Sequence, residues 1–310
     1  MIEVKHLTKR YGQHEAISDL NFKIEPGHIY GFLGPNGAGK STTMNIIAGC
    51  LAPSAGTVAI DGHDIFDEPI PAKKLIGYLP EQPPLYQDMT PREYLSFVLQ
   101  AKGVKKDEAA RQTDYIKDVT GIADVWNRLI RNLSKGYRQR VGLAQALAGN
   151  PKVIILDEPT VGLDPAQIIE MRDLIRELGK THTVLLSSHI LSEISAVCDQ
   201  VMIISKGSLV ASDTPENLSH MMSGGSKLDI TVKGEKDAAM RAFEKMEAEI
   251  EYKPRGEYTQ VILTGQGDAR EKAFWICCEE KLPIIEMKFE QASLEDVFLE
   301  LTSTSEVSDK

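Results

Sequence analysis

The segment GPNGAGKS, Gly34 to Ser41, restricts the fold more than any other part of this 310-residue chain. An apolar run from His28 to Leu33 leads into it, and apolar residues at helical spacing follow from Lys40 to Leu51. This order predicts a buried strand, a tight glycine-rich turn and a helix. A strand buried on both faces needs parallel neighbours and covering helices, so the segment favours an α/β fold.

The chemistry of this segment is phosphate binding, because it fits the pattern Gly-x-x-x-x-Gly-Lys-Ser/Thr. Its glycines let backbone N–H groups turn towards phosphate oxygens, and the following helix presents its positive end. Lys40 would contact the β- and γ-phosphates, Ser41 would bind magnesium, and Thr42 would add a hydroxyl. The predicted nucleotide contacts here are Gly34, Pro35, Asn36, Gly37, Ala38, Gly39, Lys40, Ser41 and Thr42. The alternative is a plain glycine-rich turn before a helix.

Two acidic residues lie where a phosphate loop needs them. Asp157 and Glu158 follow the apolar run Val153 to Leu156, which is typical of a parallel strand buried on both faces. A carboxylate at the C-terminal end of such a strand lies beside the phosphate loop. We therefore expect Asp157 to hold magnesium through water and Glu158 to accept a proton from the attacking water. The alternative is an ordinary acidic strand end.

Charge and composition narrow the class of protein. The net charge of −10 argues against a general affinity for nucleic acid, although Lys135 to Arg140 is a local basic candidate, and we expect no nucleic-acid partner. The four cysteines match neither a zinc site nor a disulfide framework, which fits a reducing cytoplasm. We find no signal peptide and no run of ~20 apolar residues, so the expected location is cytoplasmic.

The chain is expected to contain two domains. Strands alternate with turns or helices in residues 1–80 and 151–212, whereas residues 82–150 have a mainly helical pattern. Ser219 to Lys227 contains paired glycines and is typical of a linker. The order beyond it is strand–helix–strand–strand–helix–strand, which favours a small ferredoxin-like α+β domain. A last helix is expected from Ser293 to Leu301, before a polar tail.

Further motifs indicate a family. LSKGYRQR, Leu133 to Arg140, precedes LDEPTVGLD, Leu156 to Asp164, while Gln82 lies in LPEQ and His189 follows an apolar run. Together with the phosphate loop and in this order, these motifs resemble the nucleotide-binding domain of ABC transporters. The resemblance covers about residues 1–218.

The resemblance implies an α/β fold with a P-loop NTPase core, an antiparallel β subdomain and a helical insert, with ATP and Mg²⁺ as cofactors. The ferredoxin-like α+β domain would follow at the C-terminus. The predicted boundaries are 1–218 for the ATP-binding domain with its insert at about 83–150, 219–227 for the linker, 228–302 for the accessory domain and 303–310 for a flexible tail.

The resemblance also implies that two subunits share each nucleotide. Ser134 and Gly136 match the family's signature Leu-Ser-Gly-Gly-Gln, so they would contact ATP held by a second subunit in a head-to-tail dimer. The pair could be homomeric or heteromeric. Lys135 and Tyr137 depart from that signature. Without a partner, Ser134 would simply cap its helix.

Three other residues take roles from the resemblance. His189 matches the switch histidine, which would bridge the γ-phosphate and Glu158, although a lone histidine here would read as a surface residue. Gln82 would reach magnesium or the attacking water through its amide oxygen. Tyr11 would stack on adenine, or else be a half-buried strand aromatic. The predicted catalytic residues are Glu158, His189 and Gln82, and the predicted magnesium ligands are Ser41, Gln82 and Asp157.

The implied function is that of an ATP-hydrolysing subunit on the cytoplasmic face of the membrane, driving a separate integral membrane permease. The permease would dock on the insert near Gln82 to Thr90. ASLEDVFLELT, Ala292 to Thr302, resembles the tail of exporter subunits, including the gliding-motility type. Export is therefore the expected direction, and an importer subunit remains an alternative.

A cytosolic ABC ATPase with a non-transport target is the alternative from another class. Members that act on ribosomes usually carry two cassettes in one chain, and this chain has one. Members that act in DNA repair need a long coiled coil between the two halves of the phosphate site, but no sustained heptads occur between Lys40 and Leu133.

Overall fold

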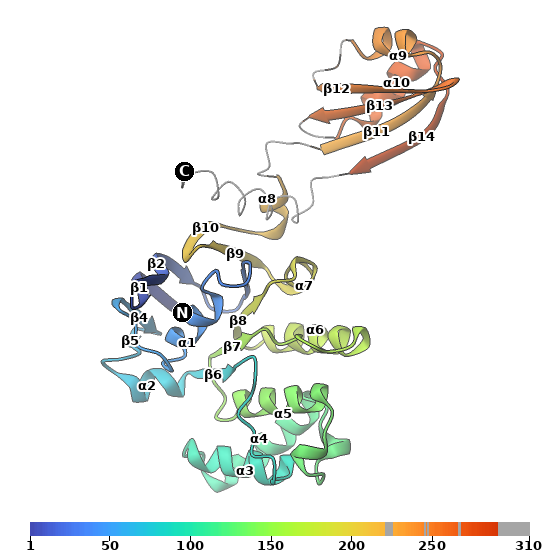
Figure 1. Ribbon diagram of the computed structural model, residues 1–310. Coiled ribbons are helices and arrows are strands. Elements are labelled where there is room, and N and C mark those ends of the chain that lie inside the picture. The colour runs from blue at the N-terminus through green and yellow to red at the C-terminus, as the bar shows by residue number, and fades with distance from the viewer. Residues whose placement is uncertain (221–225, 245, 247, 266–267, 291–310) are drawn as a thin grey trace. The chain divides into compact units, whose positions relative to one another are not determined.

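A computed structural model describes residues 1–220, 226–244, 246, 248–265 and 268–290 (Figure 1). The chain divides into two compact units, Met1–Pro215 and Glu216–Lys310, and each is considered by itself. Within the described residues, no helix combines the length and the apolar composition that a membrane crossing requires.

The centre of the first unit is a six-stranded sheet in the order β10-β9-β3-β8-β7-β6. All neighbours are parallel except β10, which pairs antiparallel with β9. Every residue of β3, β7 and β8 is buried, as the unbroken apolar runs predict. The strands are β3 (Ile29–Leu33), β6 (Ile76–Leu79), β7 (Val153–Asp157), β8 (Thr183–Ser188), β9 (Gln200–Ser205) and β10 (Ser208–Asp213).

A second, antiparallel sheet in the order β2-β1-β4-β5 shares one hydrophobic core with the first. That core joins apolar residues of β1, β2 and β4 to Met44, Ile46 and Ile47 of α1 and to Phe32 of β3. The phosphate-loop helix is thereby held between the sheets. The elements are β1 (Ile2–Tyr11), β2 (His14–Ile24), β4 (Ala55–Ile60), β5 (His63–Asp64), α1 (Lys40–Ile47) and α2 (Pro69–Lys74).

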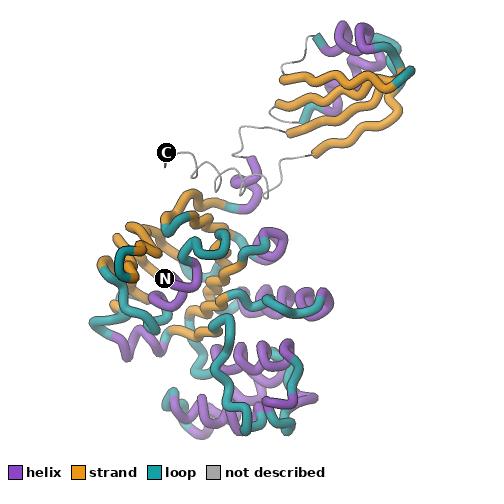
Figure 2. The backbone as a smooth tube through the Cα atoms, viewed as in Figure 1, coloured by secondary structure: helices purple, strands orange, loops and turns teal. Residues whose placement is uncertain are grey.

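The predicted helical insert lies between β6 and β7 in the chain and forms a cluster of helices beside the sheets (Figure 2). It contains α3 (Pro91–Ala101), α4 (Lys106–Val119), two short 3₁₀ turns and α5 (Lys135–Leu147). The remaining helices of this part are α6 (Pro165–Gly179) and α7 (Leu191–Val197), and α8 (Pro215–His220) follows β10. The helix from Lys40 is shorter than its apolar pattern suggested: it ends at Ile47, and Gly49 adopts a φ of 69° that turns the chain.

The second unit has the predicted order of strands and helices. Its antiparallel sheet runs β12-β13-β11-β14, which is a ferredoxin-like arrangement with the first strand in the interior. Its own core centres on Phe243, together with apolar residues of β11, β13 and α10. The elements are β11 (Ser226–Lys233), α9 (Lys236–Phe243), β12 (Glu249–Arg255), β13 (Tyr258–Gly265), α10 (Arg270–Glu279) and β14 (Ile284–Glu290).

The predicted linker, 219–227, is shorter in the structure. Helix α8 extends to His220 and strand β11 begins at Ser226, so only residues 221–225 separate them, and these lie outside the described residues. The predicted last helix, 293–301, and the tail, 303–310, also lie outside the described residues.

Candidate functional site

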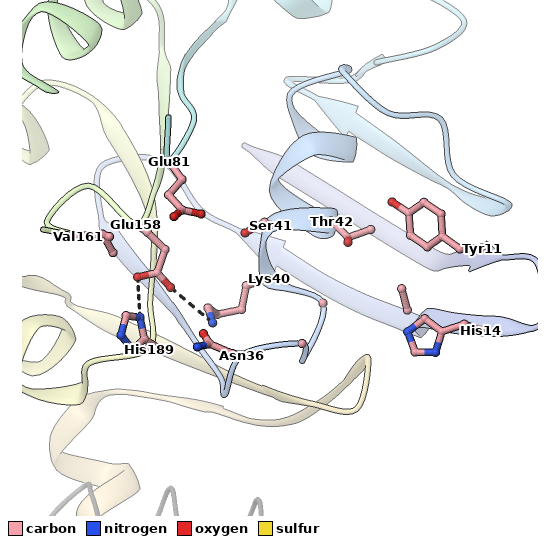
Figure 3. Close-up of a pocket in the computed structure, with 13 residues that line it drawn as sticks. Tyr11, His14, Asn36, Lys40, Ser41, Thr42, Glu81, Glu158, Val161 and His189 are labelled. Carbon is pink, nitrogen blue, oxygen red and sulfur yellow. Dashed lines mark hydrogen bonds and ion pairs between the residues drawn. The ribbon is translucent and has the colours of Figure 1, made fainter. Parts of the chain in front are cut away.

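A cavity of about 480 Å³ opens over the phosphate loop, where β3, β7 and β8 end (Figure 3). Its walls come from the β1–β2 hairpin, the loop into α1, and the segments that follow β6, β7 and β8. The lining residues are Tyr11, His14, Ala16, Asn36, Gly37, Gly39, Lys40, Ser41, Thr42, Glu81, Glu158, Val161 and His189.

The phosphate loop holds its lysine in place before any ligand is considered. Lys40 Nζ donates to the backbone oxygens of Gly34 at 2.8 Å and Pro35 at 3.3 Å. The loop needs glycine at position 39, where φ is 102° and a Cβ atom would lie 2.6 Å from the Ala16 carbonyl oxygen. The loop therefore closes around a buried cation.

Asp157 is buried behind the loop and accepts two hydroxyl hydrogen bonds. Ser187 Oγ donates to its Oδ1 at 2.6 Å, and Ser41 Oγ donates to the same oxygen at 3.1 Å. Burial is the main cause that raises the pKa of Asp157; the two hydroxyls act in the opposite direction, while the charges of Glu158 and Glu81 raise it further. Three acidic groups therefore lie within electrostatic range of one another.

The donor set around Asp157 fits the magnesium ion that the phosphate loop implies. Mg²⁺ prefers oxygen ligands and is usually held by one or two carboxylates together with substrate phosphates and water. The Ser41 hydroxyl and the Asp157 carboxylate lie side by side and supply such oxygens. Among the residues that the structure describes, no cluster of three or more His, Cys, Asp or Glu side chains is suited to a metal.

Glu158 lies between two nitrogen groups at the mouth of the cavity. Its Oε1 is 3.5 Å from Lys40 Nζ, and its Oε2 is 2.9 Å from His189 Nδ1 (Figure 3). The side chains of Glu158 and Lys40 are 8% and 6% exposed, so this ion pair is shielded from water. The Glu158 backbone has a φ of 50°, an uncommon conformation outside glycine that is often found at functional sites.

Tyr11 and His14 lie at the other end of the cavity from Glu158 and His189 (Figure 3). They flank the turn between β1 and β2, and the Tyr11 ring is 49% exposed. Lys9 Nζ lies 5.2 Å from the centre of that ring. An exposed aromatic face at this end suits stacking on a flat base, while the charged groups at the opposite end suit phosphates.

The signature residues do not line the cavity of their own chain. Ser134 is exposed and caps α5, with its Oγ accepting from the Tyr137 N–H at 3.3 Å. Gly136 is buried, and a Cβ atom there would lie 2.7 Å from Gln167 Oε1. A side chain at this position would have to displace the end of the Gln167 side chain. Lys135 extends over Gly162, in the loop that leads to α6.

Gln82 does not line the cavity over the phosphate loop in this structure, and its predicted role stays a prediction. Gln82 is exposed and lines a different cavity with Tyr78 and Pro84, whereas its neighbour Glu81 lines the cavity over the phosphate loop. The chain bends at these two residues, after β6 has ended, and only Glu81 lines the cavity over the phosphate loop. Glu81 is next to Gln82 in the chain, and the sequence analysis did not single it out.

Comparisons with known proteins agree with this geometry. Residues 17–161 match the family described as ABC transporter. The bacitracin transport ATP-binding protein BcrA of Bacillus licheniformis is 40% identical over 212 residues, 68% of each chain. The linearmycin resistance ATP-binding protein LnrL of Bacillus subtilis (strain 168) is 31% identical over 247 residues, 79% of each chain.

Solved structures extend the likeness to the fold. A dimeric ATP-binding cassette in a post-hydrolysis state, bound to ADP and Pi, matches with a TM-score of 0.63 and 26% identity. The match covers 69% of this chain and 98% of that chain. The phosphate loop, the buried acidic strand end and these relatives lead to one conclusion: the chain belongs to the ABC transporter family as an ATP-binding subunit, and it is an ATPase.

Proposed function

We propose that this subunit pairs with a second ATP-binding subunit around ATP and Mg²⁺, and that hydrolysis drives export through a separate membrane permease. The observation that carries the proposal is the position of Glu158, a buried carboxylate held between Lys40 and His189 at the mouth of the phosphate cavity. Such a group is placed to act on water next to a terminal phosphate.

In this proposal each polar group of the site has one task. Glu158 orients the attacking water and accepts its proton, while Lys40 and His189 stabilise negative charge that develops on the transferred phosphoryl group. Ser41 and Asp157 hold Mg²⁺, which when bound neutralises charge on the phosphate oxygens. Tyr11 stacks on the base. Glu158 also forms the link to His189, so the histidine can respond to a change at the carboxylate.

The exposed start of α5 supports pairing of two subunits. Ser134 is accessible at that helix terminus and lies outside its own chain's cavity, so its hydroxyl and the helix dipole are available to a nucleotide on another subunit. Lys135 adds a cation at the same surface. The dimeric cassette among the similar structures shows that a relative forms a pair.

An exposed aromatic cluster on the helical insert supports docking of a permease. The Tyr86 ring lies 5.8 Å from Tyr94 and 5.5 Å from Phe97, and Tyr86 and Phe97 are 52% and 43% exposed. Exposed aromatic clusters of this kind mark contact sites for partners. The cluster is close in the chain to Glu81, which faces the phosphate site. The name of the relative LnrL, a linearmycin resistance ATP-binding protein, fits outward transport.

Glu158→Gln tests the assignment. The amide keeps the size of the side chain but cannot accept a proton, so we expect the ATPase rate to fall by at least ~10²-fold while ATP binding is retained. Steady-state phosphate release and nucleotide binding measure the two quantities. Glu177→Gln, which changes an exposed carboxylate on α6, is the matched control. Hydrolysis at the normal rate by Glu158→Gln would show that this residue is not the base.

The same variant tests the partner. Tagged Glu158→Gln protein, recovered from native membranes in ATP, should carry a polytopic membrane protein identified by mass spectrometry. Adding Phe97→Ser should reduce that recovery, because it removes an exposed aromatic ring from the proposed docking surface. Recovery of ribosomal or DNA-bound proteins alone would favour a cytosolic, non-transport ATPase.

A further inference from the structure

Glu193 is a buried carboxylate outside the phosphate cavity. It lies in the first turn of α7, is 5% exposed and does not line the cavity. One of its oxygens, Oε2, accepts two hydrogen bonds from hydroxyl groups: Thr160 Oγ1 at 2.5 Å and Ser188 Oγ at 3.1 Å. Both donors are themselves buried.

The environment of Glu193 is an uncommon one for an acidic residue. A buried carboxylate costs free energy unless it is well compensated, usually by a cation. In the part of the chain that the structure describes, the ion pairs do not include Glu193, and its partners are the hydroxyls of Thr160 and Ser188. Apolar residues at all three positions would avoid the cost of burying this polar cluster, so a task other than stability accounts better for the carboxylate.

The two donors lie beside Glu158 and His189: Thr160 is in the loop after β7, and Ser188 is the last residue of β8. Backbone pairing between β7 and β8 ends at Asp157 and Ser187, so the residues beyond have no ladder to hold them together. Thr160 follows Glu158 by two positions, and Ser188 immediately precedes His189. Glu193 therefore connects the loops beyond the end of the sheet.

The Ser188 hydroxyl extends this link to the backbone. Ser188 Oγ donates to Glu193 and accepts from the Ile190 N–H at 2.9 Å, so it holds the chain on both sides of His189. The contact of 2.9 Å between His189 Nδ1 and Glu158 Oε2 depends on the separation of these loops. A shift of about 1 Å at such a contact is large for catalysis.

We propose that Glu193 is a positioning residue, which acts through Thr160 and Ser188 to hold Glu158 and His189 at their working separation. The inference rests on the proposed roles of Glu158 and His189. Glu193 touches neither the nucleotide cavity nor the reacting atoms, so its effect is on the rate of hydrolysis and not on the affinity for ATP.

Thr160→Val tests the link with little change in shape, because it replaces one hydroxyl by a methyl group. We expect kcat to fall about tenfold while KM for ATP stays within about twofold, since the catalytic groups shift but the nucleotide contacts do not. Thr160→Ser, which restores the hydroxyl, should recover most of the rate. Glu193→Gln keeps an accepting oxygen and should stay near the parent rate, whereas Glu193→Leu should lose it.

Thr120→Val is the matched control, because Thr120, like Thr160, is a buried threonine whose hydroxyl donates a hydrogen bond. Its acceptor is a helix carbonyl, and Thr120 is far in the chain from Glu158 and His189. Rates are expressed per bound nucleotide, so partial misfolding lowers the number of sites and leaves kcat unchanged. If Glu193→Leu does not fold, Ser188→Ala takes its place.

Three results would overturn the proposal. The first is an unchanged kcat in both Thr160→Val and Ser188→Ala. The second is a loss of rate that Thr160→Ser does not restore. The third is a change only in the number of binding sites, as a purely structural role would give. Glu158→Gln separates the claims: normal hydrolysis by it refutes the role of Glu158, whereas its inactivity beside fully active Thr160→Val and Ser188→Ala refutes only the role of Glu193.

Discussion

Glu81 is the residue whose replacement best tests the electrostatics of the site. Its carboxylate faces the phosphate cavity (Figure 3), and its charge acts on Asp157. We expect Glu81→Ala to lower the apparent affinity for Mg²⁺ about tenfold, as loss of an outer-shell oxygen partner does. Titration of the ATPase rate with Mg²⁺ measures this. Gln82→Ala is the matched control and should change the rate less than twofold, because that side chain lines another cavity. The reverse ranking would restore Gln82 to the site.

Residues of the site differ in how far the sequence could place them. Glu158 follows β7 directly and Lys40 follows β3 through the phosphate loop. Strand ends meet at one edge of a parallel sheet, so their proximity could be predicted. The choice between Glu81 and Gln82 depends on the direction of one loop, which no pattern records. Glu193 carries no motif, since its partners are 33 and 5 positions away and tertiary packing alone brings them together.

At the scale of elements, the start of α3 offers a clean test of local stability. Thr90 and Glu93 form a capping box: Thr90 Oγ1 accepts from the Glu93 N–H at 3.3 Å, and Glu93 Oε2 accepts from the Thr90 N–H at 2.9 Å. Thr90→Ala should lower the free energy of unfolding of the first unit by about 1 kcal/mol. Denaturant titration measures it, and Thr90→Ser should retain the parent stability. An equally stable Thr90→Ala would mean that the cap contributes nothing here.

The helices whose starts could be located from the sequence are those that begin at a local capping residue. Ser134 was expected to cap its helix, and the start of α5 confirms this. Thr90 and the proline after it are the corresponding local signal at the start of α3. Helix α4 (Lys106–Val119) was only part of a generally helical region, because Ile116 is its one fully buried residue among those described and its apolar stripe is narrow. A helix held mainly at the surface leaves a weak periodic signal.

At the scale of the whole molecule, the strand topology of the second unit could be predicted from the sequence better than that of the first. The second unit pairs strands that follow a recognised βαββαβ order, so its ferredoxin-like topology could be predicted. In the first unit β3 lies between β8 and β9, which are more than 150 positions away in the chain. Such pairing depends on long-range packing. The fold class of the first unit was therefore predicted from its motifs and not from a strand order.

The two separate cores lead to the last prediction. Phe243 is completely buried in the core of the second unit, whereas every residue that lines the phosphate cavity belongs to the first. Phe243→Ala should lower the stability of the second unit by ~3–5 kcal/mol, through lost burial and the cavity left behind, without changing the affinity for ATP. Trp275, alone in a Trp126→Phe background, reports unfolding of that unit by fluorescence, since the chain has two tryptophans.

Met240→Ala supplies the control, because Met240 lies on the same helix, α9, but is 44% exposed, so its loss should cost less than about 0.5 kcal/mol. ATP binding is measured on the same samples. Equal loss of ATP affinity and of second-unit stability in Phe243→Ala would mean that the second unit supports the nucleotide site. If the affinity for ATP is unchanged while Trp275 fluorescence shows that the second unit is destabilised, the second unit has a task other than building the nucleotide site.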